Sequence, residues 1–268
     1  MKNVVITGSA RGLGFCMAKL FREADFNVII SDLDEEKLNI SKKELELIDS
    51  KGDVSYKVCN VCKSSDIQEL IEFCDEKYGS IDIWINNAGV NQPDKVIWEL
   101  DEKEIDLVFD VDLKGTVIGS KFVMNYMSKK GRGAIYNVEG YGSNDAMMPG
   151  LSIYGTSKRA ITYFTQALAK EAYEMNTGVI VGRLSPGIMI TDFITNALGD
   201  KGKIELDEKT KKVYNILGDY PEVVAEYLVE QIICNKKNNC HIEWLTTKKA
   251  AWRFMTAGFN KRNFFNNK

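Results

Sequence analysis

The chain has 268 residues, a formal net charge of −3 at pH 7, and 44% hydrophobic residues. This length suits one large domain or two small ones, and the slight negative charge gives no electrostatic basis for binding nucleic acid. The longest apolar runs, such as those at 28–30 and 179–181, are far too short to span a bilayer. No charged leader or cleavage site precedes the first apolar segment, so we expect a cytoplasmic protein.

Apolar segments of strand length alternate with longer segments of helical period. In chain order, the pattern predicts a strand over 4–7, a helix over 13–24, a strand over 27–31, a helix over 35–49, a strand over 54–58, a helix over 65–78, a strand over 81–86, a helix over 101–130, a strand over 133–138, a helix over 152–175, a strand over 179–184, a helix over 221–234 and a strand over 241–245. The polar, poorly periodic segment 188–220 has the length of a binding loop.

This alternation indicates the α/β class. We expect a doubly wound Rossmann fold, in which helices cover both faces of a seven-stranded parallel sheet and ligands bind at the carboxyl ends of the strands. One domain is predicted over 1–247, with 188–220 as its substrate-loop region. A basic, aromatic tail follows over 248–268.

Six cysteines and one histidine, His241, offer few metal ligands. Cys59 and Cys62 have the spacing of half a zinc site, but no second pair matches it, so no metal is expected. His241 lies in a late apolar strand and is interpreted as structural. A Ser-His-Asp hydrolase would depend on that single histidine.

A glycine-rich segment links the first strand to the first helix, with the glycines at Gly8, Gly12 and Gly14. Glycines there allow a tight turn and a close approach to a pyrophosphate, and the helix N-terminus offers free N–H groups. Asp32, 18 residues beyond Gly14, ends the second strand and is placed to accept hydrogen bonds from a ribose. The alternative is that Asp32 only caps the next helix, a task that Asp34 could serve equally well.

Tyr154 and Lys158 lie at i and i+4 at the start of a predicted helix, so they share one helix face. An alcohol oxidised by a nicotinamide must lose its hydroxyl proton as the hydride leaves. A free tyrosine has a pKa of about 10, and a nearby ammonium favours its anion. Tyr154 is therefore the candidate acid/base, and Lys158 is its electrostatic partner.

The Gly-x-x-x-Gly-x-Gly spacing and the motifs that follow it resemble the classical short-chain dehydrogenase/reductase family over roughly residues 2–192. The resemblance implies the same roles for Tyr154 and Lys158, both of which would also contact the nucleotide. It implies that the Ile188 backbone holds the nicotinamide carboxamide and that Thr191 reaches the phosphates. The implied cofactor residues are Gly8, Ser9, Arg11, Gly12, Leu13, Gly14, Asp32, Leu33, Asn60, Val61, Asn87, Ala88, Gly89, Tyr154, Lys158, Pro186, Gly187, Ile188 and Thr191.

Two catalytic positions of that family are altered here. Gly140 and Tyr141 lie near the usual serine position, and Ser143 is the nearest hydroxyl that could polarise a carbonyl. The family's asparagine, which anchors a water in a proton relay, falls at Asp112. We interpret Asp112 as a relay substitute that could pair with Lys158.

Three stretches, at 133–143, 154–158 and 184–192, resemble the chlorophyll b reductase (non-yellow-coloring) branch of the family, as does 217–225. This resemblance implies a bulky, apolar carbonyl or alcohol substrate, and a steroid or bile-acid alcohol fits equally well. The branch's plant enzymes resemble NADPH users, with arginine in place of Asp32. A 2′-phosphate within about 4 Å of a carboxylate costs on the order of 4 kcal/mol per unit charge, so NAD is favoured over NADP.

Two other functions are considered. A non-catalytic NAD-binding sensor on the same fold would be favoured by loss of Tyr154 or Lys158, and both are present. The tail 248–268 has six basic residues, no acidic residue and several aromatics, a composition typical of an interfacial helix. We expect instead that the tail packs on protein, that the chain forms a homodimer or homotetramer, and that no membrane is bound.

Overall fold

The computed structural model describes residues 1–190, 208–260 and 262–265. Its seven strands form one parallel sheet in the order β3-β2-β1-β4-β5-β6-β7. They are β1 (Asn3–Thr7), β2 (Asn27–Asp32), β3 (Val54–Val58), β4 (Ile83–Asn86), β5 (Gly133–Val138), β6 (Val179–Ser185) and β7 (Cys240–Glu243). The predicted seven-stranded Rossmann sheet is confirmed.

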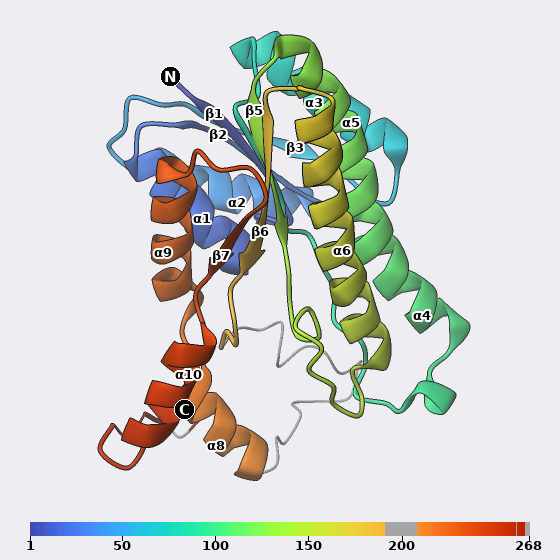
Figure 1. The fold of residues 1–268 in the computed structure, drawn as a ribbon. Coiled ribbons are helices and arrows are strands. Elements are labelled where there is room, and N and C mark those ends of the chain that lie inside the picture. The colour runs from blue at the N-terminus through green and yellow to red at the C-terminus, as the bar shows by residue number, and fades with distance from the viewer. Residues whose placement is uncertain (191–207, 261, 266–268) are drawn as a thin grey trace.

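Helices cover both faces of the sheet (Figure 1). The α-helices are α1 (Gly12–Glu23), α2 (Glu35–Glu46), α3 (Ser64–Tyr78), α4 (Glu102–Val108), α5 (Gly115–Lys130), α6 (Ser152–Glu174), α8 (Glu208–Leu217), α9 (Pro221–Cys234) and α10 (Thr247–Thr256), and a short 3-10 turn, η1, spans Ile97–Glu99. Helices α1, α2 and α9 lie on one face, and α3, α4, α5 and α6 lie on the other.

Strand residues alternate between two apolar cores. Val4 and Ile6 of β1 pack in the core beneath α1 and α9, whereas Val5 packs in the core beneath α3 and α5. All five residues of β1 are buried. A strand covered on both faces needs apolar side chains at every position, which explains the near-continuous apolar runs in the sequence.

The single helix predicted over 101–130 is divided into three segments. A π-helical turn, η2 (Phe109–Lys114), separates α4 from α5. Such wider turns occur frequently at functional sites. Asp112 lies within η2, and its side chain is fully buried. The prediction of one regular helix was therefore wrong at the point where an acidic side chain has to face inward.

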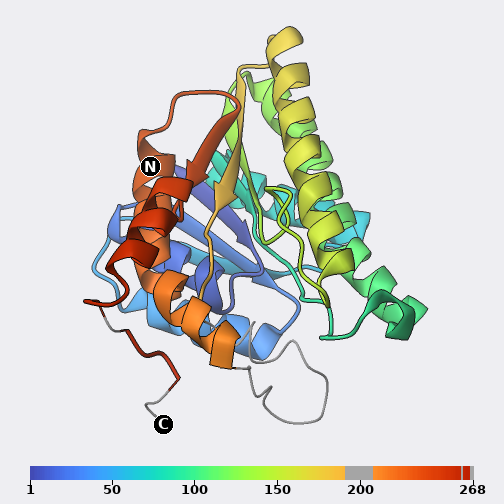
Figure 2. The same ribbon diagram turned by 60° about the horizontal axis from the view of Figure 1, so that its bottom comes forward.

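The carboxyl ends of the strands share one edge of the sheet, where the loops that carry the candidate site residues meet. Register places Thr7 opposite Ser31 and Asn86 opposite Asn137 at this edge. Helices α8 and α10 lie beyond the same edge, below the ends of β6 and β7 (Figure 1), and they come forward in Figure 2. Across the described ranges, no helix is long and apolar enough to cross a membrane.

Candidate nucleotide and active site

The glycine loop follows β1 and favours glycine at all three positions, because φ is positive at Gly8 and Gly12 and space is lacking at Gly8 and Gly14. Gly8 has a φ of +62°, and a Cβ there would lie 2.5 Å from the Ala88 Cα. A Cβ on Gly14 would lie 2.6 Å from the Gly8 carbonyl oxygen. At Gly12, with φ +59°, no atom lies within 4 Å of such a Cβ. The loop is thus tight on its protein side and open outward at Gly12.

The N-terminus of α1 is suited to bind an anion. Its N-cap residue, Arg11, makes no side-chain hydrogen bond to the helix, and the first turn holds no acidic residue. Uncapped N–H groups and the helix dipole favour a pyrophosphate at this position. The Ser9 hydroxyl points inward instead, since it donates to the Ile6 carbonyl at 2.6 Å and accepts from the Ser31 N–H at 3.0 Å. The Ser9 N–H donates to the Ser31 carbonyl at 3.0 Å, so Ser9 joins the glycine loop to the end of β2.

Asp32 and Asp34 have separate roles. Asp34 is the N-cap of α2, and its carboxylate accepts from the Lys37 N–H at 3.0 Å. The Asp32 carboxylate lies beside the glycine loop, where it accepts from the N–H groups of Ala10 at 3.3 Å and Leu33 at 2.8 Å. Two carboxylate oxygens offer about four acceptor positions, so Asp32 retains capacity for ribose hydroxyls. The helix-cap alternative for Asp32 is wrong, because Asp34 caps the helix.

Asn87 attaches the end of β4 to the glycine loop. Its side-chain amide donates to the carbonyls of Thr7 at 2.9 Å and Gly8 at 2.8 Å. The Thr7 hydroxyl accepts from the N–H groups of Asn87 and Ala88. These bonds hold the 86–89 segment in contact with the loop on which a nucleotide would lie.

The remaining nucleotide candidates line the same edge. Asn60 closes a turn, since its side-chain oxygen accepts from the Cys62 N–H at 3.0 Å, and Val61 packs beneath Gly115. After β6, Gly187 has a φ of +75°, and a Cβ there would lie 2.6 Å from the Leu245 Cβ. Ile188 follows directly, and its carbonyl accepts from the Asp219 N–H at 3.0 Å. Thr191 lies outside the described residues.

Tyr154, Lys158 and Asp112 form a buried array between α6 and η2. The Lys158 Nζ lies 2.9 Å from an Asp112 carboxylate oxygen and 5.3 Å from the centre of the Tyr154 ring. The second Asp112 oxygen accepts from the Val90 N–H at 2.7 Å. Side-chain exposure is 7% for Lys158 and 0% for Asp112. The predicted pairing of Asp112 with Lys158 is present in the structure.

Charge and burial act in opposite directions in this array. Burial alone would lower the pKa of Lys158, but the charges of Asp112, Tyr154 and Glu139 together outweigh it and the pKa of Lys158 is raised. Burial raises the pKa of Tyr154, Lys158 opposes that change, and Asp112 adds to it. Burial also raises the pKa of Asp112, against the influence of Lys158. Burial and the Asp112 charge thus favour the neutral form of Tyr154 despite the adjacent lysine.

Gly140, rather than Ser143, faces the Tyr154 hydroxyl. A Cβ on Gly140 would lie 2.4 Å from that hydroxyl oxygen. The Ser143 hydroxyl accepts from the Gly140 N–H at 3.2 Å and donates to the Lys158 carbonyl at 3.4 Å. The serine is thus turned toward backbone groups, and the absence of a side chain at Gly140 lets the tyrosine hydroxyl lie close to the turn.

Glu139 lies in the 133–143 stretch that resembles the chlorophyll b reductase branch. Its side chain connects four elements of the fold. Its carboxylate, at the end of β5, accepts from the Thr162 hydroxyl of α6 at 2.6 Å and from the Ser185 hydroxyl of β6. The His241 Nε2 of β7 lies 3.2 Å away. Burial would raise the pKa of Glu139, but His241 and these hydroxyls keep it below its usual value. His241 therefore has a structural role, as predicted, although in a polar cluster rather than an apolar one.

Gln92 is a second residue that the sequence pattern did not reveal. Its buried side-chain oxygen accepts from the N–H groups of Ile153 at 2.8 Å and Tyr154 at 3.1 Å. This caps the first turn of α6 from the loop after β4. The cap fixes the helix turn that carries Tyr154, and only the tertiary fold brings the two segments together.

Asp219 attaches the tail to the turn after β6. Its carboxylate accepts from the Trp244 Nε1 at 2.7 Å and pairs with Arg253 at 2.6 Å and Arg262 at 3.0 Å. Its carbonyl accepts from the Ile190 N–H at 2.9 Å. Two of the tail's basic residues, Arg253 and Arg262, thus have an ion-pair partner outside the tail.

Replacing Asp219 with alanine should release the tail. Hydrogen bonds to a charged group contribute about 1.5–3 kcal/mol each, so local opening of α10 should increase on the order of tenfold or more. Trypsin cleavage after Lys249 and Arg253 should accelerate by that factor. The exposed pair Asp145–Arg159 supplies the control, since Asp145→Ala should leave tail cleavage unchanged. Equal cleavage rates in both variants would show that Asp219 does not hold the tail.

Comparison with known proteins agrees with this geometry. A family model described as short chain dehydrogenase matches residues 2–201. The chain belongs to the short-chain dehydrogenase family. Members of this family are oxidoreductases that bind NAD(P) and act on small molecules.

Two curated short-chain dehydrogenases illustrate the relationship. Probable chlorophyll(ide) b reductase NYC1, chloroplastic, of Arabidopsis thaliana is 29% identical over 280 residues, which cover 98% of this chain and 54% of the relative. Chlorophyll(ide) b reductase NOL, chloroplastic, of Oryza sativa subsp. japonica is 33% identical over 262 residues, covering 95% and 74%. The chain thus spans about half the length of NYC1. The predicted resemblance to this branch is confirmed.

Among solved short-chain dehydrogenases, levodione reductase superposes with a TM-score of 0.81 at 22% identity. The match covers 93% of this chain and 98% of the levodione reductase chain. At that identity the likeness shows the fold alone, and it agrees with the sheet order described above.

Proposed function

We propose that this protein is an NAD(H)-dependent oxidoreductase that interconverts a carbonyl group and a secondary alcohol on a bulky, apolar substrate. The observation that carries the proposal is the buried array of Tyr154, Lys158 and Asp112 at the edge of the sheet that also holds the open glycine loop. A proton donor and a nucleotide-binding loop at one edge are what hydride transfer to a carbonyl needs.

Tyr154 acts as the acid/base in this proposal. The glycine loop and the Ile188 backbone would hold a nicotinamide nucleotide, which would supply or accept the hydride. In the reduction direction, the Tyr154 hydroxyl donates its proton to the carbonyl oxygen as the carbonyl carbon gains the hydride. Lys158 stabilises the resulting tyrosinate, and Asp112 fixes the Lys158 ammonium. Because burial keeps Tyr154 protonated, the array is suited to carbonyl reduction near neutral pH.

The glycine at the family's serine position has a steric explanation. Glycine at position 140 lets the Tyr154 hydroxyl lie against the 140–143 turn, because a Cβ there would clash with that hydroxyl. We propose that Ser143 holds this turn against Lys158 rather than polarising the carbonyl. Asp112 then orients the lysine directly, at the position where the family's asparagine anchors a relay water.

The proposed nucleotide is NAD(H). The Asp32 carboxylate beside the glycine loop favours ribose hydroxyls and opposes a 2′-phosphate, by on the order of 4 kcal/mol per unit charge at about 4 Å. Arg11 is exposed next to the loop and offsets part of that repulsion. Loop glycines and the N-terminus of α1 would hold the pyrophosphate, with Asn60 and Val61 beside the adenine and Thr191 near the phosphates.

The assay is nicotinamide oxidation against a panel of carbonyl compounds that includes chlorophyllide b, cyclic diketones and steroid ketones. We expect turnover of an apolar member, with kcat/KM at least about tenfold higher for NADH than for NADPH, as a difference of 1.4 kcal/mol or more implies. Asp32→Arg should reverse this preference. The matched control is Asp34→Ala, which should weaken α2 without altering nucleotide choice. Tight NADH binding with no turnover of any carbonyl would favour the sensor alternative.

A further inference from the structure

Helix α10 turns charged side chains toward the rest of the domain. Arg253 pairs with Asp219 at 2.6 Å and donates to the Leu217 carbonyl at 2.9 Å. Lys249, four residues earlier, lies over the Trp244 ring. Residues four apart share one face of a helix, so Lys249 and Arg253 form an inner face through which α10 packs on protein.

Another face of the tail is apolar and exposed. Trp252 is 62% exposed and Met255 is 69% exposed, and Phe259, in the turn that follows α10, is 93% exposed. Lys248 is also exposed, and it shares a face with Trp252 because it lies four residues before it. We call Lys248, Trp252, Met255 and Phe259 the outer face of the tail. Soluble domains normally turn the apolar side of a surface helix inward, and here large apolar side chains face outward instead.

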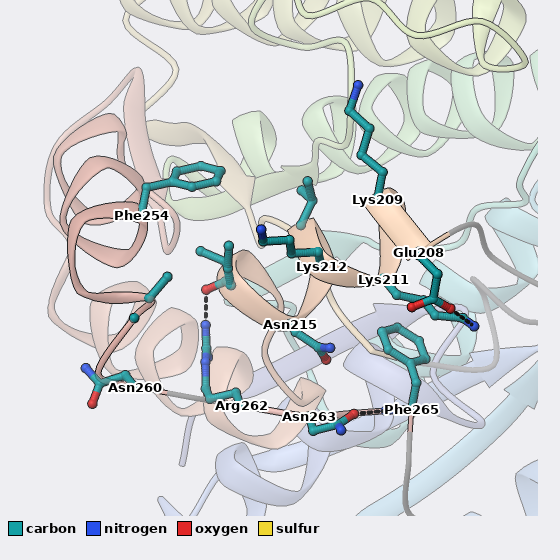
Figure 3. Close-up of a pocket in the computed structure, with 14 residues that line it drawn as sticks. Glu208, Lys209, Lys211, Lys212, Asn215, Phe254, Asn260, Arg262, Asn263 and Phe265 are labelled. Carbon is teal, nitrogen blue, oxygen red and sulfur yellow. Dashed lines mark hydrogen bonds and ion pairs between the residues drawn. The ribbon is translucent and has the colours of Figure 1, made fainter.

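A cavity of about 1000 Å³ between α8 and the tail does not cover the outer face. Figure 3 shows Phe254 extending from α10 toward α8, whose Val213 and Ile216 line the same cavity. Trp252 and Met255 are not among the lining residues. Across the described parts of the chain, α8 thus provides apolar contacts for Phe254, and the outer face is left to solvent.

Positive charge accompanies the outer face. The chain has six basic residues and no acidic residue after Glu243, although its formal net charge is −3. Arg253 and Arg262 share one carboxylate, that of Asp219. Burial and then the charge of Arg253 lower the pKa of Lys249 to about 8, as expected where cations crowd together. This end of the molecule therefore favours a negatively charged partner.

We infer that the outer face of the tail docks on an anionic lipid surface. Exposed aromatic side chains beside basic ones fit the interface of a bilayer, where apolar groups enter the acyl boundary and cations meet anionic headgroups. A second copy of this chain fits less well, since a two-fold contact through this face would bring two basic tails together. The inference departs from the sequence-based expectation that no membrane is bound, because only the structure shows that the outer face is exposed.

Docking of this kind would also orient the molecule. Helix α10 lies beyond the edge of the sheet that carries the Tyr154 array, so this edge would face the lipid (Figures 1 and 2). The inference stands apart from the proposed function, because lipid binding needs neither a nucleotide nor turnover.

The test is flotation of the whole chain with vesicles of phosphatidylcholine, alone or mixed with phosphatidylglycerol. The unmodified protein should float with the mixed vesicles and be released at high salt, which screens surface charges. Trp252→Ala combined with Phe259→Ala should lower binding at least about tenfold, because two large apolar side chains no longer enter the lipid. Lys248→Glu should lower binding at least about fivefold, the factor that corresponds to one lysine near an anionic surface.

Tyr173→Ala and Lys129→Glu are the matched controls. Tyr173 is 76% exposed at the end of α6, and Lys129 is exposed at the end of α5, both at the opposite edge of the sheet from α10. Neither change should alter vesicle binding. An unmodified protein that does not float with the mixed vesicles would overturn the inference, and so would equal losses in the control variants. If the double variant instead lowers the molecular mass in analytical ultracentrifugation and no vesicle is bound, a second copy covers the face and the inference is wrong.

Discussion

Replacing Tyr154 with phenylalanine is expected to lower kcat at least about 100-fold, because it removes the proposed proton donor. Tyr154 is 9% exposed and packs against Gly140 and Lys158, so phenylalanine retains the ring and its contacts. NADH affinity should therefore change little. Steady-state kinetics on the best carbonyl of the panel, together with a fluorescence titration of NADH, measures both quantities.

Tyr163→Phe is the matched control, since Tyr163 lies on the same helix but is 77% exposed. Its turnover should equal that of the unmodified protein. A Tyr154→Phe variant that keeps near-normal turnover would assign the proton transfer to another group. If turnover and NADH affinity fall together, the tyrosine is needed for nucleotide binding rather than for chemistry.

Asp112→Leu should be the most destabilising change at the site. It leaves the Lys158 ammonium buried without its carboxylate, and removing one partner of a buried ion pair typically costs about 3–5 kcal/mol. It also removes the acceptor of the Val90 N–H. Urea unfolding should show this loss. Exposed Asp110, which pairs with Lys114 in the same π-helical turn, provides the control, because Asp110→Leu should change stability much less.

Asp112→Asn removes the negative charge of the side chain and keeps nearly the same shape. Asparagine can still accept from the Val90 N–H and from Lys158, so the fold should be retained. The Asp112 charge contributes to the raised pKa of Tyr154, and removing it should lower that pKa. Alcohol oxidation, which needs the tyrosinate, should then reach its maximum at a lower pH. A pH profile identical to that of the unmodified protein would show that Asp112 does not act on Tyr154 through its charge.

The nucleotide end was readable from the sequence because its signals are local. The three glycines and Asp32 recur at short spacings around one strand–helix turn, although the close contact that requires Gly8 is with the distant Ala88. The order of strands and helices follows from apolar periodicity, which reports burial on both faces of the sheet. Two predictions were wrong in kind. The helix predicted over 101–130 contains a π-helical turn, which does not disturb an apolar pattern enough to be seen, and the segment 188–220, predicted as a loop, contains helix α8.

The groups that organise the active site were less visible, because they act across long sequence separations. Gln92 caps the turn of α6 from 61 and 62 residues away, and Asp219 joins residues 25, 34 and 43 positions further along the chain. Neither residue has a local pattern that marks it.

The sequence by itself determined the doubly wound fold and the glycine loop. It also determined the position of Asp32 at the end of the second strand and of Tyr154 and Lys158 on one helix face, because each follows from periodicity or from short spacing along one element. Only the tertiary structure decided that Asp34 caps α2, that Gly140 faces the tyrosine, that Asp112 is buried on Lys158, and that the tail forms a cavity with α8. Those outcomes depend on which side chains meet when distant segments pack. Contact and burial then set their charge states, and neither is encoded in local spacing.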